Sequence, residues 1–170
     1  NDIRAMVGYG DNLIIAFGTN PTKLIMVSKL NPSVILGEKI FETGYYNVSS
    51  MIIIDGNLWV TFDLSPGRIR IISIEDESVD ESIIMVRDNP IVLAEFDTFV
   101  SVITSSGTKY SELYNKTTFA YISNSIVSEI HDSCTDGTYN WFAVYTTSGN
   151  GTIARRLVAS PYTLFSFTIT

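Results

Sequence analysis

The stretch Asn57-Leu-Trp-Val-Thr-Phe62 decides the fold, because three further segments of the chain repeat its layout. These segments are Asn12-Leu-Ile-Ile-Ala-Phe17, Thr98-Phe-Val-Ser-Val-Ile103 and Asn140-Trp-Phe-Ala-Val-Tyr145. Their last residues follow one another at intervals of 45, 41 and 42 positions. In each segment, apolar residues predominate on both faces of the expected strand, which is typical of a strand that is covered on both faces. A repeat of this length indicates an array of one supersecondary unit.

Each repeated segment is followed by a cluster of Gly, Pro, Asn and Ser, which provide turn dihedrals and local hydrogen bonds. One further strand is expected before each segment and two after it, at the regular spacing of an all-β domain. The expected first strands are 5–9, 50–54, 91–96 and 130–134; the third are 23–30, 68–74, 109–115 and 153–159; the fourth are 34–41, 79–86, 119–127 and 163–169. The pattern therefore predicts four four-stranded antiparallel units, approximately 1–42, 43–87, 88–128 and 129–170.

Equal repeats favour a β-propeller over the alternative of a β-sandwich or jelly roll, because so small a sheet must pack on a neighbour. The layout resembles the β-propeller repeat families along the whole chain, although the Gly-His and Trp-Asp marks of WD repeats are missing. The stretch Asp55-Gly-Asn-Leu-Trp-Val60 looks like a short motif of propellers in bacterial sensor ectodomains. The resemblance implies a single propeller-like domain over 1–170, as a closed four-bladed ring or part of a larger one.

The bulk composition narrows the classes of partner. The net charge is −7, and the 11 basic residues are scattered. A nucleic-acid partner needs clustered Lys and Arg, so none is expected. No run reaches the roughly 18 apolar residues of a membrane span, so membrane insertion is not expected. The single cysteine, Cys134, excludes an intrachain disulfide. Low charge and an opening almost directly in a strand suggest part of a larger protein, on a virion or in an extracellular, cell-surface setting.

Four aspartates suggest a metal site. Asp11, Asp55, Asp97 and Asp136 lie at or near the expected turns between first and second strands. In a propeller these turns share one face, where the four carboxylates would form an acidic ring that holds calcium through oxygen ligands. The alternative is turn chemistry, since Asp-Gly and Asp-Asn pairs favour the positive φ angles of tight hairpins.

A second candidate site lies on the loops between the expected blades. The predicted ligand-binding residues are Tyr45, Tyr46, Asp88, His131 and Asp132. Two tyrosines beside carboxylates would stack on a sugar and hydrogen-bond to it. The alternative is that the tyrosines bridge adjacent blades. No catalytic residue is predicted, because adjacent strand residues point to opposite faces and the run His131 to Cys134 cannot by itself assemble a triad.

These observations favour a non-enzymatic binding or structural module. We expect an attachment or scaffold domain whose partners are other protein subunits of a larger assembly, such as a phage or viral appendage or a bacterial surface protein. One alternative is a propeller that binds carbohydrate or hydrolyses glycosides with paired carboxylates, for which Asp63 and Glu95 join Asp88 and Asp132. The other alternative is the ligand-sensing ectodomain of a signalling receptor.

Overall fold

The computed structural model describes residues 2–76, 78–105, 110–126, 130–135, 139–145, 151–157 and 160–168. Side chains are described up to Ile122 in these ranges, and again at residues 141–143. Regular structure in this part of the chain consists of sixteen β-strands. The described residues contain no helix with the length and hydropathy needed to cross a membrane.

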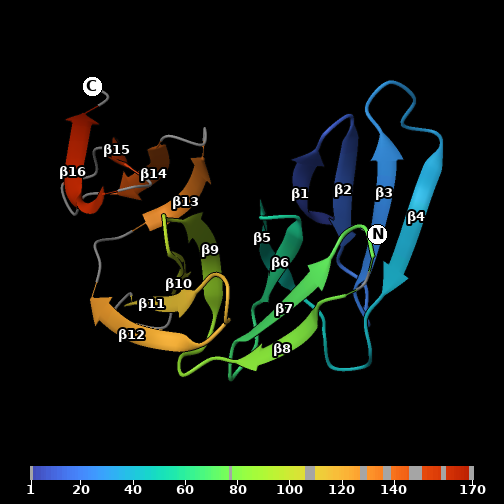
Figure 1. Cartoon of the computed structure of the whole chain (residues 1–170), viewed down its shortest axis with the longest axis horizontal. Helices are drawn as coiled ribbons and strands as arrows, with labels where there is room; N and C mark the ends of the chain where they lie inside the picture. Colours follow the sequence, from blue (N-terminus) through green and yellow to red (C-terminus); the bar gives the residue numbers. More distant parts are fainter. Residues whose placement is uncertain are drawn as a thin grey trace. The chain divides into compact units, whose positions relative to one another are not determined.

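The strands form four antiparallel sheets, each a meander of four consecutive strands (Figure 1). Sheet 1 contains β1 (Ile3–Tyr9), β2 (Asn12–Phe17), β3 (Lys23–Ser28) and β4 (Ile35–Ile40). Sheet 2 contains β5 (Val48–Ile54), β6 (Asn57–Phe62), β7 (Arg68–Ser73) and β8 (Asp80–Ile84). Sheet 3 contains β9 (Pro90–Glu95), β10 (Phe99–Thr104), β11 (Tyr110–Asn115) and β12 (Tyr121–Ile126). Sheet 4 contains β13 (Ile130–Thr135), β14 (Tyr139–Tyr145), β15 (Gly151–Leu157) and β16 (Ser160–Thr168).

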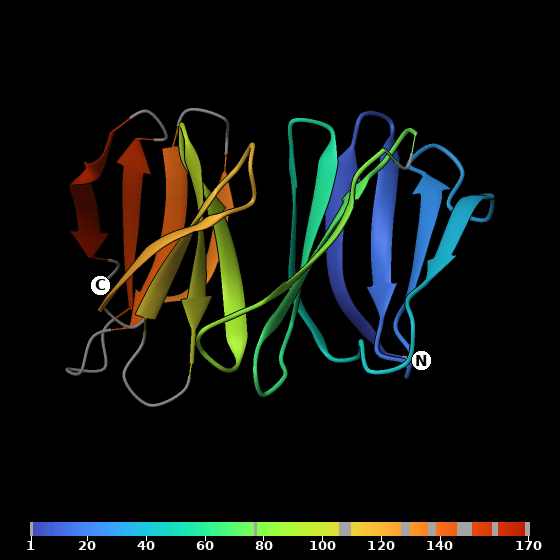
Figure 2. The same ribbon diagram turned by 60° about the horizontal axis from the view of Figure 1, so that its bottom comes forward.

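This arrangement confirms the prediction of four four-stranded antiparallel units. The strand ends agree with the expected bounds to within two residues, except at the start of the last strand, Ser160. The chain divides into two compact units, residues 1–90 with sheets 1 and 2, and residues 91–170 with sheets 3 and 4 (Figure 2). The prediction that residues 1–170 form a single domain therefore stays a prediction.

Sheets 1 and 2 repeat one another at an interval of 45 residues, which is the interval from Phe17 to Phe62 in the sequence. The agreement extends to individual backbone bonds and to the turns between second and third strands. In sheet 1 the Gly18 N–H donates to the Asp2 carbonyl over 2.8 Å, and in sheet 2 the Asp63 N–H donates to the Asn47 carbonyl over the same distance. The peptide bonds before Pro21 and before Pro66 are both cis.

The core of the first unit lies between sheets 1 and 2. Leu58, Val60 and Phe62 alternate along β6, so they share the sheet face that packs on sheet 1. From sheet 1 this core receives the side chains of Ile14, Ala16 and Leu24. The opposite face of β6 is also buried, since Trp59 and Thr61 are fully inaccessible. The two-sided burial expected for a second strand is therefore present in β6.

The second unit has its own core. It contains Val92, Ala94, Phe96, Ile103 and Phe142. Buried polar side chains are present as well, and the Tyr114 hydroxyl donates to Glu112 Oε2 over 2.6 Å. Burial and this hydrogen bond raise the pKa of Tyr114, so the phenol stays protonated.

Candidate functional site

The predicted ligand-binding tyrosines occupy different environments. Tyr45 lies in the core of the first unit, where its ring packs edge-on against Phe62 at a centroid distance of 5.1 Å. Its hydroxyl shares a hydrogen bond with Ser82 of β8. Tyr45 thus connects the loop after sheet 1 to sheet 2, which agrees with the alternative of a bridge between adjacent blades. Tyr46, its neighbour in the same loop, is exposed.

The other three predicted ligand residues are not brought together with these tyrosines by any described contact. Asp88 is half-buried in the connection between β8 and β9. His131 and Asp132 lie within β13, the strand expected at 130–134, and not in a connecting loop. The structure describes only their backbone, so the ligand-binding role of this group stays a prediction.

The acidic turns are found where the sequence predicts them. Asp11, Asp55 and Asp97 are exposed in the turns that open the first three second strands, and Asp136 lies outside the described residues. Asp55 and Gly56 have φ angles of 49° and 78°, the backbone of a tight two-residue hairpin. Within the described residues, no group of three or more His, Cys, Asp or Glu side chains is placed to hold a metal ion. The calcium site stays a prediction.

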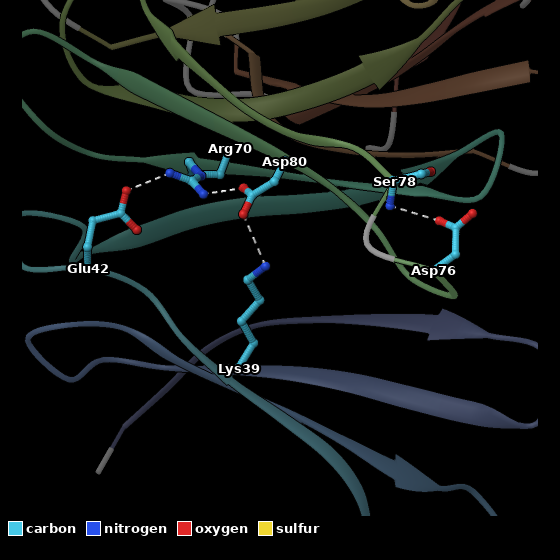
Figure 3. Close-up of polar contacts among 6 residues, drawn as sticks. All are labelled: Lys39, Glu42, Arg70, Asp76, Ser78 and Asp80. Atoms are coloured by element: carbon cyan, nitrogen blue, oxygen red, sulfur yellow. Dashed lines mark hydrogen bonds and ion pairs between the residues drawn. The ribbon is translucent and has the colours of Figure 1, made fainter.

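A polar cluster not predicted from the sequence lies between sheets 1 and 2. Figure 3 shows Arg70 of β7 between two carboxylates, with Lys39 of β4 reaching one of them. Arg70 Nη1 donates to Glu42 Oε1 over 2.6 Å, and Nη2 donates to Asp80 Oδ1. Lys39 Nζ lies 3.4 Å from Asp80 Oδ2. The Asp80 carboxylate is therefore paired with one positively charged side chain from each sheet, Lys39 from sheet 1 and Arg70 from sheet 2.

Arg70 is only 8% exposed, although its charge would favour water. Burial acts to lower its pKa, but hydrogen bonding to Tyr45 and the carboxylates of Asp80 and Glu42 raise the pKa above its ordinary value. The guanidinium also lies 5.2 Å from the Tyr45 ring centroid and 5.8 Å from that of Phe41, within the range of cation–π attraction. Arg70 thus ties the loop after β4 to sheet 2.

The turn after β7 carries a second set of carboxylate contacts. The Asp76 carboxylate accepts hydrogen bonds from the Ser73 hydroxyl and, at 3.0 Å, from the Ser78 N–H. These bonds stabilise the ionised form and lower the pKa of Asp76 to about 2. In the same turn Glu75 accepts a hydrogen bond from the Tyr9 hydroxyl of β1. The turn therefore places the Glu75 carboxylate against sheet 1.

A pocket of about 200 Å³ opens between sheets 1 and 2, beside the Arg70 cluster. Apolar side chains of Leu24 and Met26 on one sheet and of Leu58 and Ile72 on the other form much of its lining. Gly37 and Lys39 of β4 also line it, and Lys39 joins the pocket to the Arg70 cluster.

The outer edge of sheet 1 passes along this pocket. β4 is the last strand of its sheet, and within the described residues no further strand is hydrogen-bonded to its outer side. Apolar side chains are exposed along this strand and just before it, at 44% for Val34, 56% for Ile35, 49% for Leu36 and 58% for Ile40. An uncovered edge with apolar residues invites pairing with another chain.

The sequence carried one usable signal for the Arg70 cluster. Arg68 and Arg70 are two positions apart on an expected strand, so their side chains share one face. Ile72 continues that face into the core between the sheets, which places both arginines there. Asp80 and Glu81 begin β8, inside the fourth strand expected at 79–86.

Comparison with known proteins supports the fold. No protein-family model matches the chain, and no curated protein matches its sequence. Three similar solved structures are the computationally designed Ika4 protein (TM-score 0.64, 12% identity, covering 99% of this chain and 92% of that one), the RRP9 WD40 repeats (0.68, 12%, 91% and 50%) and a chain of the Mitotic Checkpoint Complex (0.65, 9%, 95% and 49%).

These likenesses assign the chain to the β-propeller-like all-β fold, as predicted, in preference to a sandwich or jelly roll. The chain resembles WD40 repeats in fold without carrying their sequence marks. It spans about half the length of the RRP9 and Mitotic Checkpoint Complex chains that it matches. At these identities the likeness concerns the fold alone, so function is argued from the site.

Proposed function

We propose that this chain is a non-enzymatic binding module that serves as an attachment or scaffold domain of a larger protein assembly. The observation that carries the proposal is the apolar outer edge of sheet 1, formed by Val34, Ile35, Leu36 and Ile40. Natural sheets usually protect such edges with charges, bulges or a covering segment. An edge with this many exposed apolar side chains is best explained by a protein surface that covers it.

The fold supports the same role. A chain of similar fold belongs to a multiprotein assembly, the Mitotic Checkpoint Complex. The proposed setting is a virion appendage or a bacterial surface protein, which suits a chain with only 17% charged residues. The proposal needs no bound cofactor, since edge pairing and apolar burial supply the binding energy.

Site-specific photocrosslinking tests the proposal. A photoreactive phenylalanine analogue replaces Leu36 in the full-length parent protein, which is irradiated in its source cells and purified. We expect one discrete crosslinked protein species, because Leu36 lies on the apolar edge. The matched control carries the analogue at Glu81 of β8, which lies 45 residues after Leu36. Equal or absent crosslinking at the two positions would contradict a protein-binding role for this edge.

A further inference from the structure

We infer that the pocket and the β4 edge form one binding site for an extended segment of a partner protein. The segment adds to sheet 1 as a fifth strand, inserts one bulky apolar side chain into the pocket, and carries basic residues beside it. This inference rests on the proposed binding function and specifies the chemical class of the partner.

The volume of the pocket selects the occupant. Pockets that hold a whole small-molecule ligand measure roughly 300–1,000 Å³. A dry cavity of about 150 Å³ is enough to bind benzene. The pocket here, at about 200 Å³ with Leu24, Met26, Leu58 and Ile72 in its lining, therefore fits one aromatic ring or branched aliphatic side chain. Such a group is most simply supplied by a residue of a polypeptide.

Gly37 keeps the pocket open. It pairs with Met26 across the two strands, so both lie on the sheet face that meets sheet 2. A Cβ atom at Gly37 would lie 3.8 Å from Met26 Cε, an ordinary contact distance, so a side chain has room there. Because glycine supplies no side chain, that room is available to an incoming residue.

The free backbone N–H and C=O groups of β4 are oriented so that a further strand can pair with them. The Phe41 N–H donates to the Thr22 carbonyl over 3.0 Å, which fixes the alternation of the antiparallel ladder. Gly37 and Lys39 therefore direct their backbone groups toward β3, while Glu38 and Ile40 direct theirs toward the free edge. A peptide that pairs with Glu38 and Ile40 places alternate side chains on the face that contains the pocket.

The charged side chains around the pocket determine which charge the partner segment should carry. Ile74 lines the pocket, and the next two residues along the chain, Glu75 and Asp76, are exposed acids. Lys39 and Arg70 are already engaged with Asp80. The surplus charge is negative, which favours Lys or Arg two positions from the inserted side chain, on the same face of the added strand.

Binding of a defined peptide to the ¹⁵N-labelled full chain tests the inference. The probe is acetyl-Lys-Thr-Phe-Thr-Lys-amide, in which the phenylalanine and both lysines share one face when extended. We expect amide shifts centred on Glu38 and Ile40 and methyl shifts at Leu24 and Met26. Replacing the probe's phenylalanine with alanine should weaken binding at least about tenfold, because an apolar ring is no longer buried.

Two changes separate the parts of the inference. Gly37→Leu fills the pocket from within and should abolish probe binding while the melting temperature is kept or raised. Ser33→Leu adds the same side chain in the turn before β4, outside the pocket lining, and should bind as the natural chain does. A probe with N-methylated amides on the side facing β4 should not bind, because it cannot donate to the edge.

The inference is overturned if the probe fails to bind the natural chain, if Gly37→Leu binds it equally well, or if N-methylation has no effect. Failure of the probe together with specific crosslinking from Leu36 would leave the proposed binding function intact and remove only the peptide site. Loss of both signals would remove the proposed function as well.

Discussion

Sheets 1 and 2 share one backbone plan but differ in how far their side chains are buried. In β6 every residue after Asn57 is buried, whereas in β2 only Ile14 and Ala16 are. The equivalent backbone hydrogen bonds at a 45-residue interval show that the two sheets share this part of the backbone path despite the difference in burial. The repeat therefore determines the path of the backbone, whereas side-chain packing determines which of two equivalent residues contributes more to stability.

The outer strands differ in chemistry as well. β8 begins with Asp80-Glu81, and charged residues on an edge strand discourage pairing with another chain. β4 begins with Ile35-Leu36-Gly37 and exposes the two apolar side chains. Ile84 at the end of β8 is exposed as well. The contrast therefore concerns the first residues of the two outer strands, which are charged in β8 and apolar in β4, and for this reason we place the binding site on sheet 1.

The largest expected difference between the sheets lies at the last residue of the second strand. Phe62 is fully buried against Phe41 and Tyr45, so Phe62→Ala should reduce the free energy of unfolding by about 3–5 kcal/mol. Phe17 is only half-buried, so Phe17→Ala should cost about 1–2 kcal/mol, because less apolar surface is lost. Urea unfolding followed by tryptophan fluorescence measures both. Equal losses would show that the two sheets are packed alike.

The third strands provide the next comparison. Arg70→Met removes two ion pairs and the contacts with two rings, and should cost about 2–3 kcal/mol. The loss stays below that of a fully buried pair because the Glu42 and Asp80 side chains are 57% and 43% exposed and regain water. Lys23→Met breaks a surface pair with Glu38 and should cost less than about 1 kcal/mol.

Unfolding of these two variants in low and in 1 M salt distinguishes the mechanisms. The small Lys23 effect should vanish at high salt, because exposed charges are screened. The Arg70 effect should largely persist, because packing against Tyr45 and Phe41 is independent of salt. An Arg70 loss that disappears in salt would assign this cluster to the surface.

The sequence predicted the repeating plan well because strand alternation and turn residues are local signals. The match between Phe17 and Phe62 could be found without coordinates, and so could the turn at Asp55-Gly56. The cluster around Arg70 could not, because Glu42 reaches it only once the loop after β4 has folded over sheet 2. The pocket depends on a side chain that Gly37 lacks, and such a gap leaves no local pattern.

The turns between second and third strands give a smaller effect. A Cβ atom at Gly67 would lie 2.8 Å from the Arg87 carbonyl oxygen, so Gly67→Ala should cost about 1–2 kcal/mol. The backbone cannot easily shift, since the Gly67 N–H also donates to that carbonyl over 3.1 Å. The equivalent residue of sheet 1 is Thr22, which is buried and already carries a side chain. Thermal unfolding of Gly67→Ala and Thr22→Ala compares the two turns.

Gly37→Ala serves as the control for this prediction, because its Cβ has only an ordinary contact with Met26. Alanine loses less backbone freedom on folding than glycine does, so Gly37→Ala should leave the free energy of unfolding unchanged or raise it by up to about 1 kcal/mol. If Gly67→Ala were equally neutral, the close approach of Arg87 would not restrict this turn.

The smallest expected effect concerns the turns between third and fourth strands. Asp76 should titrate at a pKa of about 2, because Ser73 and Ser78 hydrogen-bond to its carboxylate. Its pKa in the folded chain lies below the value of about 3.9 for an unfolded aspartate, so it contributes stability above pH 4 that is lost as the pH falls toward 2. NMR titration of the Asp76 carboxyl carbon measures the shift directly.

Ser73→Ala should raise the pKa of Asp76 toward its ordinary value, since the largest cause of the shift is removed. The equivalent positions of sheet 1 are Ser28 and Asn31, and there the Ser28 hydroxyl accepts a hydrogen bond from the Leu30 N–H over 3.2 Å. Asp76→Asn gives sheet 2 the uncharged residue of sheet 1 and should remove this part of the acid dependence. A titration near pH 3.9 in the natural chain would mean that Ser73 does not hold the carboxylate in solution, and that the two turns differ in sequence but not in function.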